Sequence, residues 1–192
     1  PRTRAIVPVH YAGVGCEMEA LGELAERSGA MLIEDNAHGL FGAYRGRPLG
    51  SFGALSALSF HETKNVFCGE GGALVVNDPA QVARAEILRE KGTDRSRFFR
   101  GEVDRYTWID VGSSYLMSDL LAAFLLGQLE TRVASQARRQ RLWVRYTGEL
   151  VAWAHRRGVR LGNHPDRRRI ALRLVDRGLL LAFGPEDRGL LL

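Results

Sequence analysis

A lysine lies between a strand-like segment and a glycine cluster in the stretch SFHETKNVFCGEGGALVVND, residues 59–78. Lys64 is one of two lysines in the chain, and the other 25 of its 27 basic residues are arginines. A lysine amine can lose its proton and attack a carbonyl, whereas an arginine stays protonated. Lys64 is therefore a candidate nucleophile, and a solvated surface lysine is the alternative that composition leaves open.

Three further polar side chains lie where predicted strands end. Asp35 and His38 follow one short apolar segment, and Ser59 ends another, shortly before Lys64 and the glycine cluster 69–72. In α/β proteins the carboxyl ends of strands border the crevice that binds ligands, and glycines let the backbone approach a ligand closely. We therefore expect these side chains to converge, although Asp35 as a helix cap and Ser59 as an ordinary strand residue are alternatives.

This combination suits an aromatic, phosphorylated aldehyde such as pyridoxal phosphate. An amine can bind the aldehyde covalently, and a carboxylate can keep the ring nitrogen protonated so that the ring accepts electrons. Hydroxyl and backbone N–H groups can hold the phosphate. Residue types and spacing alone suggest this cofactor without deciding it.

The elements around these residues alternate between short strands and helices, which indicates an α/β fold. Strands are expected over 5–10, 30–33, 54–60 and 73–76. A helix should follow the first strand, with Met18, Leu21, Leu24 and Ala25 on one face, and a second should run from Asp78 to about Glu90. Loops are expected over 39–53 and 91–114.

A long helix should start after Ser118 and Asp119, either of which can cap it. Within this helix, four large side chains recur at intervals of three or four residues, which predicts a buried stripe: Trp143, Tyr146, Leu150 and Trp153.

Composition limits the classes of protein that fit. The chain is 45% hydrophobic and 26% charged, as expected for a water-soluble globular protein, and no apolar segment is long enough to span a membrane. Cys16 and Cys68 match no metal-binding spacing, so we expect no metal site. We expect both cysteines to be small buried side chains and the protein to reside in a reducing cytoplasm. Residues 138–192 hold 13 arginines against 5 acidic residues, without a nucleic-acid-binding motif. A solvated face or an acidic partner surface therefore explains them at least as well as nucleic acid.

The segment IEDNAHGLFGAYRGRPLGSFGALSALSFHETKNVFCGEGGALVVND resembles the cofactor region of the DegT/DnrJ-type sugar aminotransferases. The later run REKGTDRSRFFRGEVDRYTWIDVGSSYLMSDLLAAFLLGQLE extends the resemblance over the first three quarters of the chain. The resemblance implies a fold-type I pyridoxal phosphate transferase of the aspartate aminotransferase type. Residues 1–135 would belong to the large cofactor-binding α/β/α domain, and 136–192 would form the long helix and the start of the small domain.

The resemblance also implies a role for each candidate. Lys64 would be the Schiff-base lysine, Asp35 would pair with the pyridine nitrogen, and His38 would contact the ring hydroxyl. Ser59 would bind the phosphate, as would Ser114, which stands where many relatives have Asn in a loop that reaches the neighbouring subunit. Because Lys64 is present rather than the histidine of related dehydrases, transamination is the expected reaction.

The substrates implied are L-glutamate and a dTDP-linked 4-keto-6-deoxyhexose. The assembly implied is a homodimer with shared sites, for which residues 98–115 are a candidate interface or, alternatively, a packed loop within one subunit. No nucleic-acid or membrane partner is expected. The sequence opens without Met, in strand-like text, and so reads as part of a longer protein whose preceding segment would complete the cofactor site. After residue 161 it departs from the family pattern, which keeps open a non-catalytic remnant or a binding protein with an Arg-rich surface.

Overall fold

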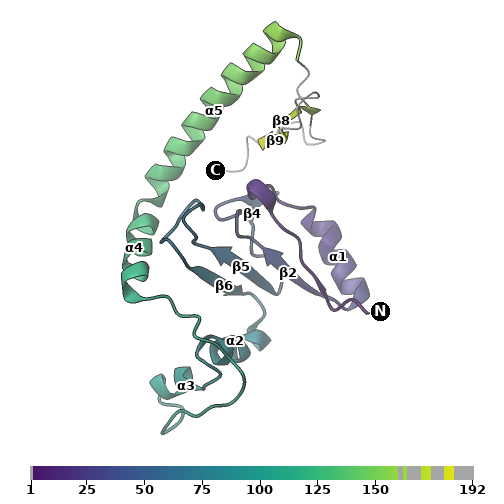
Figure 1. Cartoon of the computed structure of the whole chain (residues 1–192). Helices are drawn as coiled ribbons and strands as arrows, with labels where there is room; N and C mark the ends of the chain where they lie inside the picture. The colour runs from purple at the N-terminus through teal and green to yellow at the C-terminus, as the bar shows by residue number, and fades with distance from the viewer. Residues whose placement is uncertain (1, 160–161, 164–169, 174–179, 184–192) are drawn as a thin grey trace.

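The computed structural model describes residues 2–159, 162–163, 170–173 and 180–183. Its central sheet has the order β1-β2-β5-β6 and consists of β1 (Ala5–Ile6), β2 (Met31–Asp35), β5 (Leu55–Ser59) and β6 (Gly72–Val76). The first three strands run parallel, and β6 pairs antiparallel with β5. Figure 1 shows helix α1 on the β2 side of this sheet and helix α4 on the β6 side.

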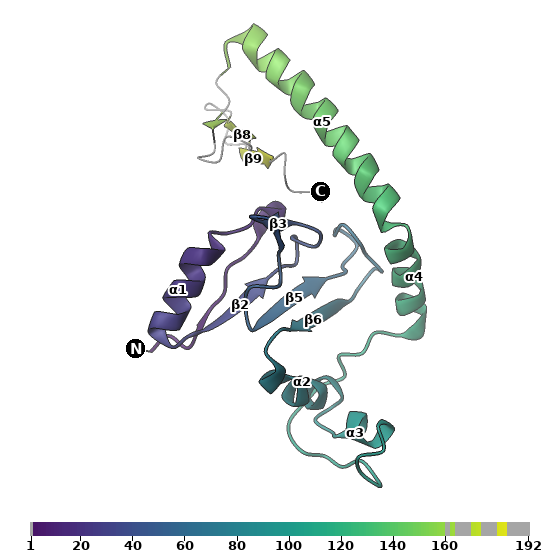
Figure 2. The same ribbon diagram turned by 180° about the vertical axis from the view of Figure 1, so that it is seen from behind.

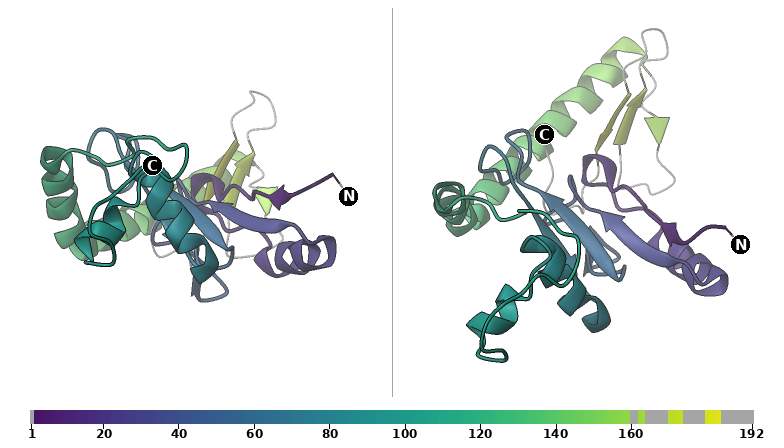
Figure 3. Two further views of the ribbon diagram at one scale, coloured as in Figure 1. Left: turned by 90° about the horizontal axis from the view of Figure 1, so that it is seen from below. Right: turned by 60° about the horizontal axis from the view of Figure 1, so that its bottom comes forward.

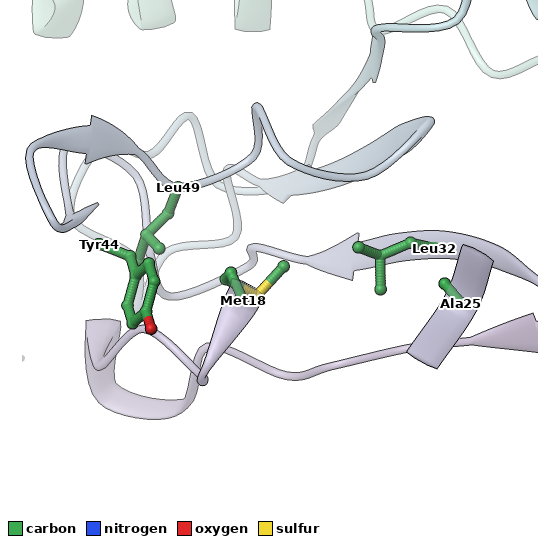
Figure 4. Packing of buried hydrophobic residues seen from close by; sticks show 5 residues of the cluster. All are labelled: Met18, Ala25, Leu32, Tyr44 and Leu49. Carbon is green, nitrogen blue, oxygen red and sulfur yellow. The ribbon is translucent and has the colours of Figure 1, made fainter. Parts of the chain in front are cut away.

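Helix α1 (Met18–Ser28) packs on β2 and forms the first core. It ends at Gly29, whose left-handed backbone (φ 64°) closes the last turn. Figure 4 shows the buried residues of this core, which are Met18, Ala25, Leu32, Tyr44 and Leu49. The expected apolar face is confirmed at Met18 and Ala25, but Leu24 is exposed.

The segment 39–53, expected to be a loop, contains a small hairpin of β3 (Ala43–Tyr44) and β4 (Arg47–Pro48). Its two turn residues, Arg45 and Gly46, both have positive φ, which matches the right-handed twist of a tight hairpin. Arg45 also pairs with Glu19 of α1, so the hairpin is attached to the first core.

A capped helical segment follows β6, as expected, and divides into the 3-10 helix η2 (Pro79–Gln81) and α2 (Val82–Arg89). The Asp78 carboxylate accepts a hydrogen bond from the N–H of Ala80 and so caps the start of η2. The segment 91–114, expected to be a long ordered loop, is mostly loop but also contains the short helix α3 (Arg95–Phe99). The Arg95 guanidinium lies 5.1 Å from the Phe99 ring centre, a contact between residues one helical turn apart.

The long helix expected after Ser118 is present as two helices, α4 (Asp119–Glu130) and α5 (Arg132–Arg157). The Ser118 hydroxyl accepts from the N–H of Leu121, which confirms the predicted cap. The predicted buried stripe was wrong at Tyr146 and Trp153, which are 68% and 41% exposed. Helical periodicity shows which residues share a face but not whether a partner covers it. Most of α5 extends past the sheet (Figure 2), and the stripe is covered only in part, with Trp143 and Leu150 half-buried.

Three short strands, β7 (Gly162–Asn163), β8 (Ile170–Arg173) and β9 (Leu180–Phe183), form a separate antiparallel sheet. The right-hand view of Figure 3 shows it apart from the central sheet. The remaining residues of the expected small domain lie outside the described part. Within the described residues, no helix combines the length and apolar character needed to cross a membrane.

Candidate functional site

The ends of β2 and β5 place two of the predicted site residues at one edge of the sheet. Asp35 is the last residue of β2 and Ser59 the last of β5, and the two strands are parallel neighbours with Asp35 opposite Ala57. One oxygen of the half-buried Asp35 carboxylate, Oδ1, accepts from the N–H of Ala37 at 3.1 Å. Within the described residues no other group bonds to this carboxylate, so Oδ2 remains available to a ligand.

The loop between β5 and β6 carries Lys64, and main-chain bonds close its base. The N–H of Phe60 donates to the carbonyl of Gly71 at 2.8 Å, and the carbonyl of Phe60 accepts from the N–H of Cys68 at 2.9 Å. Beyond Lys64, Val66 and Cys68 are buried against Phe60 and against Leu125 of α4. This second core therefore holds both sides of the loop whose turn presents the lysine.

The two lysines of the chain differ in their surroundings. The Lys91 ammonium lies 3.6 Å from the Glu90 carboxylate. The partly buried Lys64 amine makes no ion pair and no side-chain hydrogen bond with any described residue. An amine without a carboxylate partner is free to react with a carbonyl once it loses its proton.

His38 is held by a main-chain bond that determines its tautomer. The Ala12 N–H donates to Nδ1 of His38 at 3.2 Å, so Nδ1 must be the unprotonated nitrogen and Nε2 carries the hydrogen. The Tyr11 ring lies beside the imidazole, with the ring centres 5.2 Å apart. The imidazole therefore presents an Nε2–H donor.

Electrostatics show that three of the candidates lie near one another. Burial lowers the pKa of His38 below its ordinary value of 6.5, the positive charge of Lys64 lowers it further, and the negative charge of Asp35 acts in the opposite direction. Charges separated by much more than the screening length in water would not act in this way. Asp35, His38 and Lys64, from three segments of the chain, thus form one cluster in which the pKa of His38 lies below its ordinary value.

Ser59 lies where the Lys64 loop begins, and its hydroxyl oxygen accepts from the N–H of His61 at 3.4 Å. Ser114 lies elsewhere. It is exposed, its backbone pairs with Glu90 in an isolated bridge, and no described hydrogen bond joins it to the other four residues. The described structure thus places Asp35, His38, Ser59 and Lys64 on neighbouring strand ends and loops, and it leaves Ser114 outside that group.

Sequence reasoning missed a buried polar pair behind this cluster. His10 and Glu34 are both fully buried and lie 2.9 Å apart. Two acids in succession at the end of a strand, Glu34 and Asp35, were the available signal. Successive strand residues face opposite sides of a sheet, so one of the two had to point away from the crevice.

The cluster combines an amine that pairs with no described acidic residue, a carboxylate with an available oxygen, an imidazole N–H and a hydroxyl. Such a set can capture a planar phosphorylated aldehyde, because the amine adds to the carbonyl while the other groups orient the ring and the phosphate. Within the described residues, no group of three His, Cys, Asp or Glu side chains could hold a metal ion.

Comparison with known proteins places the chain among sugar aminotransferases. The model of the DegT/DnrJ/EryC1/StrS aminotransferase family matches residues 1–175. GDP-perosamine synthase of Caulobacter vibrioides is 36% identical over 172 residues, which are 90% of this chain and 42% of that protein.

Solved structures agree in fold. DesI, solved in the presence of its TDP-sugar product, is 36% identical with a TM-score of 0.61, over 73% of this chain and 34% of its own. The PLP-form of the putative sugar aminotransferase Spr1654 from Streptococcus pneumoniae is 21% identical with a TM-score of 0.69, over 96% of this chain and 46% of its own. The expected fold-type I α/β class is confirmed, and the chain spans less than half of the length of each of these relatives.

Proposed function

This chain belongs to the DegT/DnrJ/EryC1/StrS aminotransferase family, and we propose that its Asp35, His38, Ser59 and Lys64 form the lysine side of a pyridoxal phosphate site. The observation that carries the proposal is the cluster in which the charges of Lys64 and Asp35 both act on His38. Its donor set fits the cofactor, because each polar position of pyridoxal phosphate has a matching group. A Spr1654 structure in the PLP-form supports the same choice of cofactor.

Each residue has a distinct task in this proposal. Lys64 binds the aldehyde covalently, and Asp35 accepts the hydrogen of the pyridinium nitrogen. The Nε2–H of His38 donates to the ring oxygen, and the Ser59 hydroxyl contacts the phosphate. When bound, pyridoxal phosphate supplies an electron sink that stabilises the carbanion left after a proton leaves the amino-bearing carbon.

The reaction we propose is a transamination in two halves. L-Glutamate gives up its amino group and leaves as 2-oxoglutarate, and the 4-keto group of a dTDP-linked 6-deoxyhexose then receives that amino group. In the first half the amino group of glutamate displaces Lys64 from the aldehyde carbon, and the freed, neutral Lys64 amine takes the proton from the α-carbon of glutamate. In the second half the same amine returns a proton to C4 of the sugar. The activity is that of a dTDP-4-amino-4,6-dideoxygalactose transaminase, which serves the synthesis of bacterial surface polysaccharides.

Loss of deuterium from glutamate tests the first half-reaction. The chain loaded with pyridoxal phosphate should exchange the α-deuterium of labelled L-glutamate with water, because Lys64 transfers that proton. Lys64→Arg should abolish the exchange, since the guanidinium stays protonated, whereas the matched Lys91→Arg should leave it intact. Exchange that persists in Lys64→Arg would contradict the assignment of Lys64, and loaded wild-type chain without exchange would contradict the proposed reaction.

A second candidate substrate is a GDP-linked sugar, which the 36% identity with a GDP-perosamine synthase favours. The TDP-sugar product in the DesI structure, at the same identity, favours the dTDP-linked one. Calorimetric titration with dTDP and with GDP separates the two, because each nucleotide carries the recognition groups without the reacting sugar. Tighter binding of dTDP supports our choice, and tighter binding of GDP replaces it with the second candidate.

We also propose that the protein is a cytoplasmic homodimer and that residues 98–115 form part of its interface. Through this interface Ser114 reaches the cofactor phosphate of the partner subunit. Support comes from the exposed apolar side chains of this segment, since Trp108 is 77% and Val111 is 83% exposed. Exposed apolar surface of this kind marks interaction sites.

The change of helix direction at Thr131 supports a domain boundary near residue 135.

The Arg-rich surface of α5 favours a competing, non-catalytic role. Helix α5 carries far more exposed basic than acidic side chains. The exposed basic residues include Arg132, Arg138, Arg141, Arg145, Arg156 and Arg157. Such a surface fits an acidic partner. Salt-sensitive binding of poly-glutamate, together with no exchange of glutamate deuterium, would support this role over the transaminase.

A further inference from the structure

A fully buried charged residue, Glu34, lies directly behind the candidate site. It is 0% exposed, as is His10, whose Nε2 lies 2.9 Å from Glu34 Oε2. A carboxylate is costly to bury unless it is fully hydrogen-bonded, so its retention here calls for a role.

The Glu34 carboxylate gathers main-chain donors from the segment that leads into β5. Its Oε2 accepts from the N–H of Gly50 at 2.7 Å, in addition to the bond with His10. Its Oε1 accepts from Phe52 and Gly53 at 2.6 and 2.7 Å. These bonds hold the carboxylate ionised and fasten the start of the strand that ends at Ser59.

His10 extends this set of bonds to the segment 10–16. Its Nδ1 accepts from the N–H of Cys16 at 3.3 Å, so the hydrogen of the imidazole is on Nε2 and points to Glu34. The Gly13 N–H also bonds to the carbonyl of His10 at 3.0 Å. The segment 10–16 is thus folded back on the ring of His10, which Glu34 holds in place.

Inside this closed segment lies the group that orients His38. Ala12 has a left-handed backbone (φ 52°), an unfavourable conformation for a residue with a side chain, which the surrounding bonds must maintain. In that conformation its N–H donates to Nδ1 of His38. If the segment relaxed, Ala12 would return to negative φ and the donor would turn away from the imidazole.

We propose that Glu34 is a positioning residue that acts through His10 and Ala12 to hold His38 as the Nε2–H tautomer facing the site. Glu34 lies on the face of β2 opposite Asp35, so one strand end supplies a ligand-facing carboxylate and a supporting one. The link to catalysis rests on the proposed function, whereas the orientation of His38 is a property of the chain alone.

The test reads the tautomer of each histidine from its imidazole ¹⁵N chemical shifts in the full chain without cofactor. In the wild type, His10 and His38 should each carry a single hydrogen, on Nε2. Glu34→Gln should remove the single tautomer of His38, because an amide cannot accept from His10 and from three backbone N–H groups together. Since no cofactor is used, failure of the cofactor proposal would leave this result unchanged.

The matched control is Glu17→Gln. The Glu17 carboxylate also accepts a side-chain bond, from the Tyr44 hydroxyl at 2.8 Å. Glu17 follows the segment 10–16 directly in the chain, and its carboxylate makes no hydrogen bond or ion pair with His10. This variant should keep the single tautomer of His38 even if its thermal stability falls. His10→Gln, whose amide can both donate to Glu34 and accept from Cys16, should also keep it.

Two results would overturn the proposal. One is an unchanged His38 tautomer in a folded Glu34→Gln chain, which would reduce Glu34 to a purely structural role. The other needs no variant: a hydrogen on Nδ1 of either histidine in the wild type would show that the Cys16 or the Ala12 bond does not exist.

Discussion

The positive charge of Lys64 acts on His38, although the two lie 26 positions apart in the sequence and follow different strands. The two are brought together because β2 and β5 are parallel neighbours, so the segments that leave them begin at one edge of the sheet. An imidazole kept neutral next to a lysine is suited to donate one hydrogen bond to a bound ring.

We expect the pKa of His38 to respond to its two charged neighbours. Removing the lysine charge in Lys64→Gln should raise this pKa, and removing the carboxylate charge in Asp35→Asn should lower it further. A histidine titration by NMR measures both, with Lys91→Gln as the control that should change nothing. An unchanged His38 pKa in Lys64→Gln would show that the two residues are not neighbours.

The same lowered pKa predicts how His38 affects stability. The folded state binds the proton more weakly than the unfolded state, so the free energy of unfolding falls as the pH drops from 6.5 through the lowered pKa. Above pH 6.5 this contribution is fully present. Denaturant titrations in this window should show a smaller loss of stability in His38→Gln than in the wild type, and equal slopes would contradict the assigned direction.

Asp35→Asn should weaken the binding of pyridoxal phosphate. A hydrogen bond to a charged group contributes roughly 1.5–3 kcal/mol, so we expect the dissociation constant to rise about 10- to 100-fold. Asp78→Asn is a matched control, because both carboxylates accept from the N–H two residues further along the chain. Equal affinities of the two variants in a fluorescence titration would reduce Asp35 to a turn residue.

Gly92 should be indispensable to the loop that carries Ser114. A Cβ there would lie 1.7 Å from the carbonyl oxygen of Asp110, which no local shift can accommodate. Gly101 has a similar positive φ but open space around it. Gly101→Ala should therefore cost about 1–2 kcal/mol through backbone strain alone. Gly92→Ala should lower the melting temperature clearly more, and equal effects would contradict the close packing at Gly92.

If residues 98–115 form the dimer interface, Val111→Asp should weaken self-association. A buried charge at the centre of an interface typically costs at least 2 kcal/mol, so we expect the dimer dissociation constant to rise about 30-fold or more. Val144→Asp places the same charge on an exposed valine of α5 and should have little effect. Sedimentation measures the self-association of both variants. A wild type that stays monomeric at tens of micromolar, roughly the concentration at which weak dimers form, would exclude the interface.

The parts of the fold that were predicted from sequence are those that local patterns determine. The apolar spacing of α1, the Ser118 cap and the short apolar strands around Asp35 and Ser59 all gave correct elements. The β3–β4 hairpin was missed because its strands have two residues each, too few for an alternating pattern. Tyr146 and Trp153 were placed in a core because periodicity does not reveal whether a partner surface exists.

The residues of the candidate site were likewise predictable only where a local pattern marks them. Asp35 and Ser59 could be located from strand ends, and Lys64 from the rarity of lysine. The bond from Ala12 to His38 could not be foreseen, since it joins residues 26 apart and requires a left-handed alanine. Nor could three of the four partners of Glu34, because Gly50, Phe52 and Gly53 donate through their main-chain N–H groups, which leave no mark in the sequence.

The most direct test of the cofactor site is to incubate the purified chain with pyridoxal phosphate, reduce it with borohydride and map the modified peptide by mass spectrometry. We predict that the cofactor is attached to Lys64 alone and that attachment is lost in Lys64→Ala but not in Lys91→Ala. Attachment to Lys91, equal attachment in Lys64→Ala, or no attachment to the wild type would contradict the account of Lys64 as the residue that binds the cofactor.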